Sequence, residues 1–288
     1  MLSLKSEQIE HYRTEGYVVV PSIFSSGDLQ DVDRTIEQLT DEALASGVLE
    51  GVMELEPETD EGRPLPRRIY NPFEQHEHFR RLATDDRILD RIVSLVGPNV
   101  ALQHSKLNMK PAKVGSVVEW HQDLAYFPHT NDDLVTTLIY LDDATEQNGC
   151  LQVMPRHHTH YFNHELPDGT FAGMITEELD DGRYGRPVAL ASPAGSVIFM
   201  HPMTPHSSLP NRSDRGRRTL IFEYRAADAF RICTGNMDAT EKFTHHLRGE
   251  EARFARFGGP PPIIYKMRKQ VKSLYQLQAE SKKIQGKS

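Results

Sequence analysis

Residues 134–154, LVTTLIYLDDATEQNGCLQVM, decide the fold class that we predict for this chain. Two apolar runs, 134–141 and 150–154, flank a polar stretch that ends in Asn148-Gly149. Short runs rich in β-branched and aromatic residues predict strands, and an Asn-Gly pair is a common turn between antiparallel strands. The stretch therefore indicates a strand–turn–strand unit rather than a helix.

Similar short runs recur on both sides of this unit, with turn residues between them and no helical pattern. They are 99–110, 114–121, 187–191, 196–200 and 217–225. Many short strands without intervening helices favour an antiparallel sandwich or barrel over a parallel sheet.

Helical patterns precede the predicted strands. Apolar residues recur at helical spacing over 27–46, and 5–15 and 76–96 are also predicted helices, whereas the acidic and then Pro/Arg-rich 48–68 predicts a loop. After residue 228 the chain again becomes helical in pattern, and basic. We therefore expect a mainly β protein with flanking helices around a double-stranded β-helix, the cupin-like jelly roll.

We expect a single domain made of three parts. Residues 1–98 form an N-terminal region of helices and a strand, 99–227 form the jelly-roll catalytic core, and 228–288 form a basic helical tail. Within the core, 157–186 is long and polar for a connection. It predicts a lid-like insertion, because loops of this length often cover or form binding sites.

Composition narrows the class of protein. The 288 residues are 38% hydrophobic and 26% charged, which is ordinary for a globular enzyme, and the net charge of −8 argues against nucleic acid as the main partner. No apolar run reaches the length of a membrane helix, the first residues lack a signal-peptide core, and two cysteines make no disulfide framework. We expect a cytoplasmic protein that acts on a small molecule, without a membrane or nucleic-acid partner, and its oligomeric state stays open.

A candidate metal site begins in the stretch 117–129, VVEWHQDLAYFPH. His121 is the only one of 14 histidines with an acidic residue, Asp123, two positions later. Side chains two residues apart on a strand point to the same face, so this imidazole and this carboxylate can reach one metal. Two histidines and one carboxylate hold non-haem iron(II) and leave three positions open.

The third ligand and a carboxylate-binding group should come from later strands. His201 and His206 both follow the apolar run 196–200, and Arg217 and Arg218 open the next predicted strand. An arginine near the metal would offer a planar fork for a carboxylate, which 2-oxoglutarate has at its far end.

The ordered motifs W-H-Q-D, N-G-C-L-Q-V-M-P-x-x-H and G-S-V-I-F-x-H-P-x-x-x-H-x-S-x-x-N-x-S-x-x-x-R-R resemble those of the phytanoyl-CoA dioxygenase family over roughly residues 8–227. Members of that family are iron(II)- and 2-oxoglutarate-dependent oxygenases. The resemblance implies that His121, Asp123 and His206 are the iron ligands and that Arg217 grips the distal carboxylate of 2-oxoglutarate. Thr219 should share the face of Arg217 and bond the same carboxylate. Because the carboxylate ligand is present, oxygenation is expected and halogenation is not.

Further residues are candidates for contacts around this centre. Three are expected to face the cosubstrate, the alternatives being an edge strand or plain barrel lining: Asn108, Thr137 and Ile139. Three are expected near the substrate, the alternatives being packing at the mouth or a solvated loop: Tyr126, His129 and Arg156.

The implied activity is hydroxylation of an unactivated C–H bond of a small-molecule metabolite, with Fe(II), 2-oxoglutarate and O₂, and with release of succinate and CO₂. The same iron centre can also support desaturation, epoxidation, cyclisation or demethylation. A jelly-roll binding protein without activity, or a cupin-type metalloenzyme that does not use 2-oxoglutarate, is the rival from another class. The motifs describe iron and cosubstrate, and they leave the substrate open.

Overall fold

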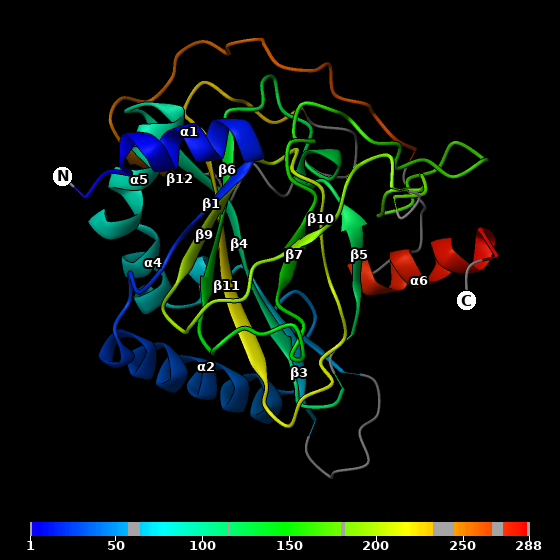
Figure 1. Cartoon of the computed structure of the whole chain (residues 1–288). Helices are drawn as coiled ribbons and strands as arrows, with labels where there is room; N and C mark the ends of the chain where they lie inside the picture. Colours follow the sequence, from blue (N-terminus) through cyan, green and yellow to red (C-terminus); the bar gives the residue numbers. More distant parts are fainter. Residues whose placement is uncertain are drawn as a thin grey trace.

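The structure is a computed structural model that describes residues 2–56, 64–114, 116–179, 182–232, 245–266 and 273–286. Two antiparallel sheets face each other, and helices cover the outer side of the larger one (Figure 1). Across these ranges, no helix combines the length and the apolar character needed to cross a bilayer.

The larger sheet has eight strands in the described part of the chain. Their order is β1 (Tyr17–Val20), β9 (Val197–Met200), β6 (Leu134–Tyr140), β11 (Arg217–Ala226), β4 (Val100–Lys110), β3 (Pro66–Tyr70) and β2 (Met53–Leu55), and β12 (His245–Arg248) also pairs with β4. Every pairing is antiparallel.

The smaller sheet is formed by β5 (Val118–His121), β10 (His206–Ser208), β7 (Leu151–Val153) and β8 (Val188–Ala189), in that order. Between the sheets, Tyr140 and Ile198 of the larger one pack against Leu151 and Val153 of the smaller one. This arrangement confirms the predicted double-stranded β-helix.

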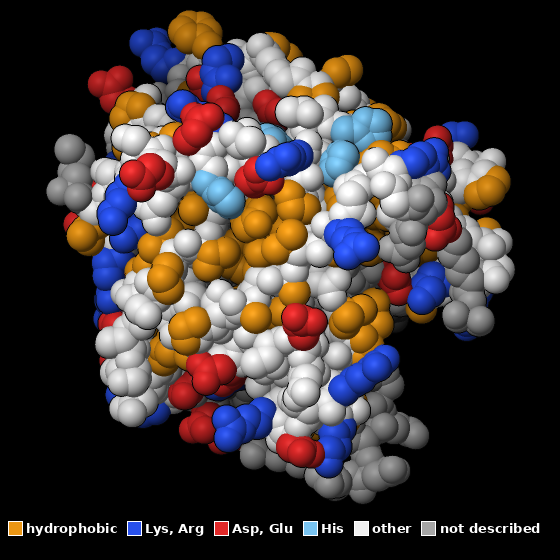
Figure 2. Space-filling model, in the orientation of Figure 1, with side chains coloured by type: hydrophobic (Ala, Val, Ile, Leu, Met, Phe, Trp, Pro, Cys, Tyr) orange, Lys and Arg blue, Asp and Glu red, His pale blue; other side chains and the backbone are white. Residues whose placement is uncertain are grey.

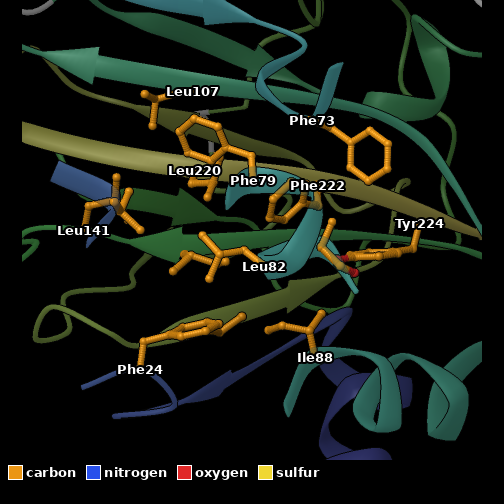
Figure 3. Packing of buried hydrophobic residues seen from close by; sticks show 14 of the residues in the cluster. Phe24, Phe73, Phe79, Leu82, Ile88, Leu107, Leu141, Leu220, Phe222 and Tyr224 are labelled. Atoms are coloured by element: carbon orange, nitrogen blue, oxygen red, sulfur yellow. The ribbon is translucent and has the colours of Figure 1, made fainter. Parts of the chain in front are cut away.

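The helices are α1 (Ser6–Glu15), α2 (Ser26–Ser46), α3 (Pro72–Gln75), α4 (Glu77–Ala83), α5 (Asp86–Val96) and α6 (Leu274–Ile284). The apolar sides of α2, α4 and α5 bury the outer face of the larger sheet. Phe79, Leu82 and Ile88 lie against Phe222 and Tyr224 of β11 in this cluster (Figure 3). The helices thus hold the strands from behind and leave the inner face for the site.

Two N-terminal predictions need correction. The segment expected to be a loop over 48–68 contains β2 and most of β3, and β3 extends the sheet by pairing with β4. Proline is tolerated there because Pro66 is the first residue of its strand. The helix expected over 76–96 is broken, because the Asp85 side chain accepts from the Arg87 N–H and starts α5 anew.

The expected helical tail is helical only in part. After β12 the chain runs extended from 249 to 266 across one end of the molecule, and then α6 lies beside β5 (Figure 1). Leu277 of α6 packs with Phe171, and Gln278 donates from Nε2 to the Gly173 carbonyl at 2.7 Å. Residues 233–244, 267–272 and 287–288 of the predicted tail lie outside the described residues.

The surface seen in Figure 2 carries hydrophobic side chains near its middle, with lysine, arginine and acidic side chains interspersed around them. An open groove is lined by His11 of α1, by Tyr17 and Val19 of β1, and by Leu190. On the face shown in Figure 2, positive and negative side chains are mixed and form no block of a single sign.

Candidate metal centre

Two neighbouring strands of the smaller sheet bring two histidines together. His121 ends β5, His206 begins β10, and the two residues are direct partners in the antiparallel register. Their ring centroids lie 4.0 Å apart. Gln122 continues in an extended conformation, and Asp123 then opens the short 3₁₀ helix η1 (Asp123–Ala125). The extended residue preserves the strand alternation, so the carboxylate returns to the same face as His121.

The three side chains form a compact donor set. His121 Nε2 lies 3.8 Å from Asp123 Oδ1, and His206 Nε2 lies 3.8 Å from Asp123 Oδ2. All three residues are buried, and their ligand atoms lie within 4.8 Å of one another. This is the one such group of metal-binding side chains in the described ranges. Its composition, two imidazoles and one carboxylate, suits iron(II).

Backbone contacts place each imidazole in the form that binds a metal. His121 Nδ1 lies 2.8 Å from the Glu119 carbonyl oxygen, and His206 Nδ1 lies 3.0 Å from that of Thr204. A carbonyl only accepts, so each Nδ1 carries the proton and each Nε2 keeps its lone pair toward the centre. Burial lowers the pKa of both histidines, which keeps the rings neutral.

The carboxylate ligand is held ionised and oriented. Burial alone would raise the pKa of Asp123, but the charge of Lys106 leads the contacts that outweigh burial and hold the pKa below its usual value. Thr136 of β6 donates from Oγ1 to Asp123 Oδ2 at 2.7 Å. Lys106 Nζ lies 3.8 Å from Asp123 Oδ1 and 2.9 Å from Glu223 Oε1.

A cavity of about 50 Å³ connects this group to a buried arginine on β11. Arg217 is 5% exposed, and its terminal nitrogens donate to Thr219 Oγ1 at 2.6 Å and to the Gly149 carbonyl at 2.5 Å. Its Nε is buried without a partner among the described atoms. Burial lowers the pKa of Arg217, so a carboxylate in this cavity would stabilise the charged guanidinium.

The next residue along the strand points the other way. Arg218 binds Asp142 through Nε and Nη2 at 2.9 and 2.7 Å, and its Nη1 lies 2.7 Å from Asp33 on α2. Alternation on β11 thus assigns one arginine to the cavity and the other to the helix layer.

Two further predicted residues lie beside the centre. Asn108 lines the cavity and accepts from Arg68 Nε at 2.9 Å. Tyr126 packs edge-on against the His121 ring at 5.6 Å, and its hydroxyl donates to the Gly173 carbonyl. Both side chains are thereby fixed before any ligand binds.

Thr137 and Ile139 do not line this cavity. The residues of β6 that line the cavity are Thr136, Leu138 and Tyr140, whereas Ile139 packs into the helix-side core. Every residue of β6 is buried, so the strand lacks the polar alternation that reveals which face is which.

His129 and Arg156 also lie elsewhere. His129 is buried between the Phe127 carbonyl and Gln103 Oε1, at 2.6 and 3.2 Å, and does not line the cavities beside the metal ligands. Arg156 is an exposed residue that pairs with Glu15 at the end of α1. Both were predicted because they lie close in sequence to residues of the site. The turns after η1 and β7 lead them away from it in space.

Sequence reasoning missed Lys106, Thr136, Arg68 and Tyr275, all of which line the cavity around the metal ligands. Lys106 had a usable signal, since it lies two residues before Asn108 on one strand and shares its face. Arg68 and Tyr275 had none, because β3 was expected to be a loop and α6 arrives from the far end of the chain.

Comparison with known proteins agrees with this geometry. Residues 12–219 match the sequence profile of the phytanoyl-CoA dioxygenase (PhyH) family. The chain belongs to this family. It is 33% identical over 231 residues to a protein of Stutzerimonas stutzeri named "Probable alpha-ketoglutarate-dependent hypophosphite dioxygenase", covering 78% of this chain and 80% of that one. It is 27% identical to the L-proline trans-4-hydroxylase of Streptomyces griseoviridis, covering 74% and 83%.

A solved relative shares the architecture. The structure of EctD from S. alaskensis with bound Fe superposes with a TM-score of 0.70 at 22% identity, covering 89% of this chain and 88% of that one. With family membership and the His-Asp-His group, this PhyH protein is an iron(II)- and 2-oxoglutarate-dependent dioxygenase. The rival of a jelly roll without activity is thereby set aside.

Proposed function

We propose that this PhyH protein hydroxylates an unactivated C–H bond of a small-molecule metabolite, and that His121, Asp123 and His206 hold the iron. The buried donor set with both Nε2 lone pairs turned inward carries the proposal. Iron(II) with 2-oxoglutarate supplies the activation of O₂, with succinate and CO₂ as by-products. Thr136 fixes the carboxylate ligand by its hydrogen bond.

Arg217 and Thr219 are proposed to seat the distal carboxylate of 2-oxoglutarate, with Asn108 near its other end. The support is a buried guanidinium that faces the cavity and, in the described part of the chain, donates to the neutral oxygens of Thr219 and Gly149. Burying such a charge is costly unless an anion joins it, so the site is built for a carboxylate that arrives with the cosubstrate. Tyr126 would border the substrate from the ring edge of His121.

The function is tested by iron and cosubstrate binding. Oxygen-free protein supplied with iron(II) and 2-oxoglutarate should develop the visible charge-transfer absorption of a 2-oxoglutarate–iron(II) chelate. His206→Ala should abolish the absorption, whereas His201→Ala should retain it, because His201 is half-buried and lies near Asp132 instead. Absence of both iron binding and the absorption in the natural protein would refute the proposal.

Product analysis then distinguishes hydroxylation from another oxidation on the same centre. Succinate formation that rises on addition of a substrate, with an oxygen atom from O₂ recovered in the product, is the expected result. Recovery of an alkene, epoxide or ring product without a new hydroxyl would replace hydroxylation by that reaction and leave the iron site unchanged.

A further inference from the structure

A second cavity, of about 210 Å³, lies against the metal ligands on the side of β3 and β4. His121 and Asp123 line it as well as the cavity that holds Arg217, so a molecule in it would lie next to the metal position. Its volume equals about seven water molecules at about 30 Å³ each. It is below the usual range of drug-sized pockets, so it suits a compact molecule rather than a long acyl chain or a coenzyme.

We propose that His104 of β4 recognises the substrate in this cavity by accepting, at Nδ1, a hydrogen bond from an N–H or O–H group of that molecule. The substrate is then a compact amine or alcohol. The inference rests on the proposed function, because it concerns the substrate of that same iron centre. The phase of β4, the contacts of the imidazole ring and its unpartnered nitrogen carry it.

The position of His104 on β4 turns its side chain toward the site. It lies two residues before Lys106, whose Nζ lies 3.8 Å from Asp123 Oδ1, and side chains two residues apart on a strand share a face. Between them, Ser105 points to the helix layer, where its Oγ accepts from the Phe73 N–H at 3.0 Å. His104 lines this second cavity and not the one that holds the cosubstrate-binding arginine.

Two contacts fix the ring of His104. Its centroid lies 4.5 Å from that of Phe127, and its Nε2 lies 3.3 Å from Glu223 Oε1. Lys106 donates to the same carboxylate oxygen at 2.9 Å, so this oxygen is an acceptor and Nε2 is the nitrogen that carries the proton. Burial, and then the charge of Lys106, lower the pKa of His104, which keeps the ring neutral. Nδ1 therefore keeps its lone pair and can only accept.

This Nδ1 is a buried acceptor that has no hydrogen-bond partner in the described part of the chain. A buried polar atom without a partner costs free energy, so a bound molecule that supplies a donor is stabilised there. The two tyrosine hydroxyls that line the cavity are, by contrast, already committed. Tyr70 donates to Glu54 Oε2 at 2.9 Å, and Tyr126 donates to the Gly173 carbonyl. A donor on the substrate would therefore find its acceptor in His104.

The apolar part of the wall accounts for the carbon skeleton of the substrate. Phe127 and Leu274 line the cavity together with Tyr126, which packs edge-on against the His121 ring at 5.6 Å. A short hydrocarbon portion can pack on this wall while the donor is held at His104. The hydrogen bond would then select which carbon lies next to the metal position, so His104 would influence both affinity and the position of oxidation.

The test uses the full chain loaded with iron(II) and 2-oxoglutarate, and two sets of isosteric probes. The first set is 2-aminoethylphosphonate, 2-hydroxyethylphosphonate and propylphosphonate, and the second is β-alanine, 3-hydroxypropionate and butyrate. Binding is followed without oxygen by the shift of the chelate absorption, and turnover by succinate. We expect the amine or the alcohol of a set to bind and to stimulate succinate formation. The methyl member of that set should bind at least about tenfold more weakly, because it leaves the acceptor unpaired.

Two variants separate recognition by His104 from packing of its ring. His104→Asn keeps an acceptor near the position of Nδ1, whereas His104→Gln places its amide near the position of Nε2 and leaves Nδ1 without a replacement. The KM of the active probe should rise about tenfold or more in His104→Gln, and His104→Asn should restore most of that loss. The Kd for 2-oxoglutarate, measured by titration of the chelate absorption, should stay unchanged in both.

The two proposals fail in different ways. If the chelate forms but no amine or alcohol probe binds to the loaded protein, or if the methyl members bind equally well, the His104 inference is overturned and the proposed function stands. The inference is equally overturned if His104→Gln retains the KM of the natural protein, or if His104→Asn is as impaired as His104→Gln. If no chelate forms at all, the proposed function itself fails.

Discussion

Replacing Arg217 by alanine is the sharpest test of how the cosubstrate binds. The guanidinium is 5% exposed, and no acidic side chain in the described ranges lies within 4 Å of it, so the distal carboxylate of 2-oxoglutarate would be its counter-charge. Loss of one partner from such a buried charge pair costs about 2–5 kcal/mol, and each 1.4 kcal/mol is a tenfold change. The Kd for 2-oxoglutarate should therefore rise at least about 30-fold.

The assay is titration of the iron(II)-loaded protein with 2-oxoglutarate under oxygen exclusion, followed by the chelate absorption. Arg218→Ala is the matched control, since Arg218 follows on the same strand but binds Asp142 and Asp33 on the other face. Iron binding should survive in both variants, because the His-Asp-His group is untouched. Tight 2-oxoglutarate binding by Arg217→Ala, or its loss in Arg218→Ala, would refute this reasoning.

Three further predictions concern the metal shell, the acid stability and the core. Thr136→Val removes the hydrogen bond to Asp123 and should weaken iron(II) binding about 10- to 100-fold by metal titration, and an unchanged affinity would contradict that role. Hydrogen bonds from Arg87 lower the folded-state pKa of Asp28, so this pair stabilises the fold above the unfolded pKa and the stability is lost as the pH falls through the folded pKa. Asp28→Asn should then lower the melting temperature at pH 7, and the difference from the natural protein should shrink as the pH is lowered below about 4; a difference that stays constant over this range would contradict it. Phe79→Ala, at a fully buried position under β11, should cost about 3–5 kcal/mol of unfolding free energy by urea denaturation, and a loss below about 1 kcal/mol would show that the helix layer is not tightly packed.

Local patterns in the sequence predicted the jelly roll and the pair His121 and Asp123, whereas His206 and Arg217 were selected by resemblance to the family motifs. The alternating short strands predicted an antiparallel core, and β4, β6, β9 and β11 lie within a residue or two of their predicted ranges. His121 and Asp123 could be paired because a spacing of two on an extended segment places both on one face. Alternation places Arg217 and Arg218 on opposite faces, and the spacing from His206 in the family motif favoured Arg217.

Alternation failed where a strand is buried on both sides. In β6 the sequence LVTTLIY offers two adjacent threonines, and only the packing of the two sheets decides that Thr136 faces the metal ligands while Thr137 faces away. The period of a strand is a local property, but its phase relative to the core depends on which face meets the other sheet.

By itself, the sequence determined the strand-rich core and the pairing of His121 with Asp123, because both depend on residue type and short spacing. The tertiary structure alone decided the rest of the cavity wall around the metal ligands. Arg68 reaches it from a strand that pairs with β4 across 40 residues of chain, and Leu274 and Tyr275 reach it from α6 near the other end. Contacts of this range are set by sheet register and helix docking, which no local pattern encodes.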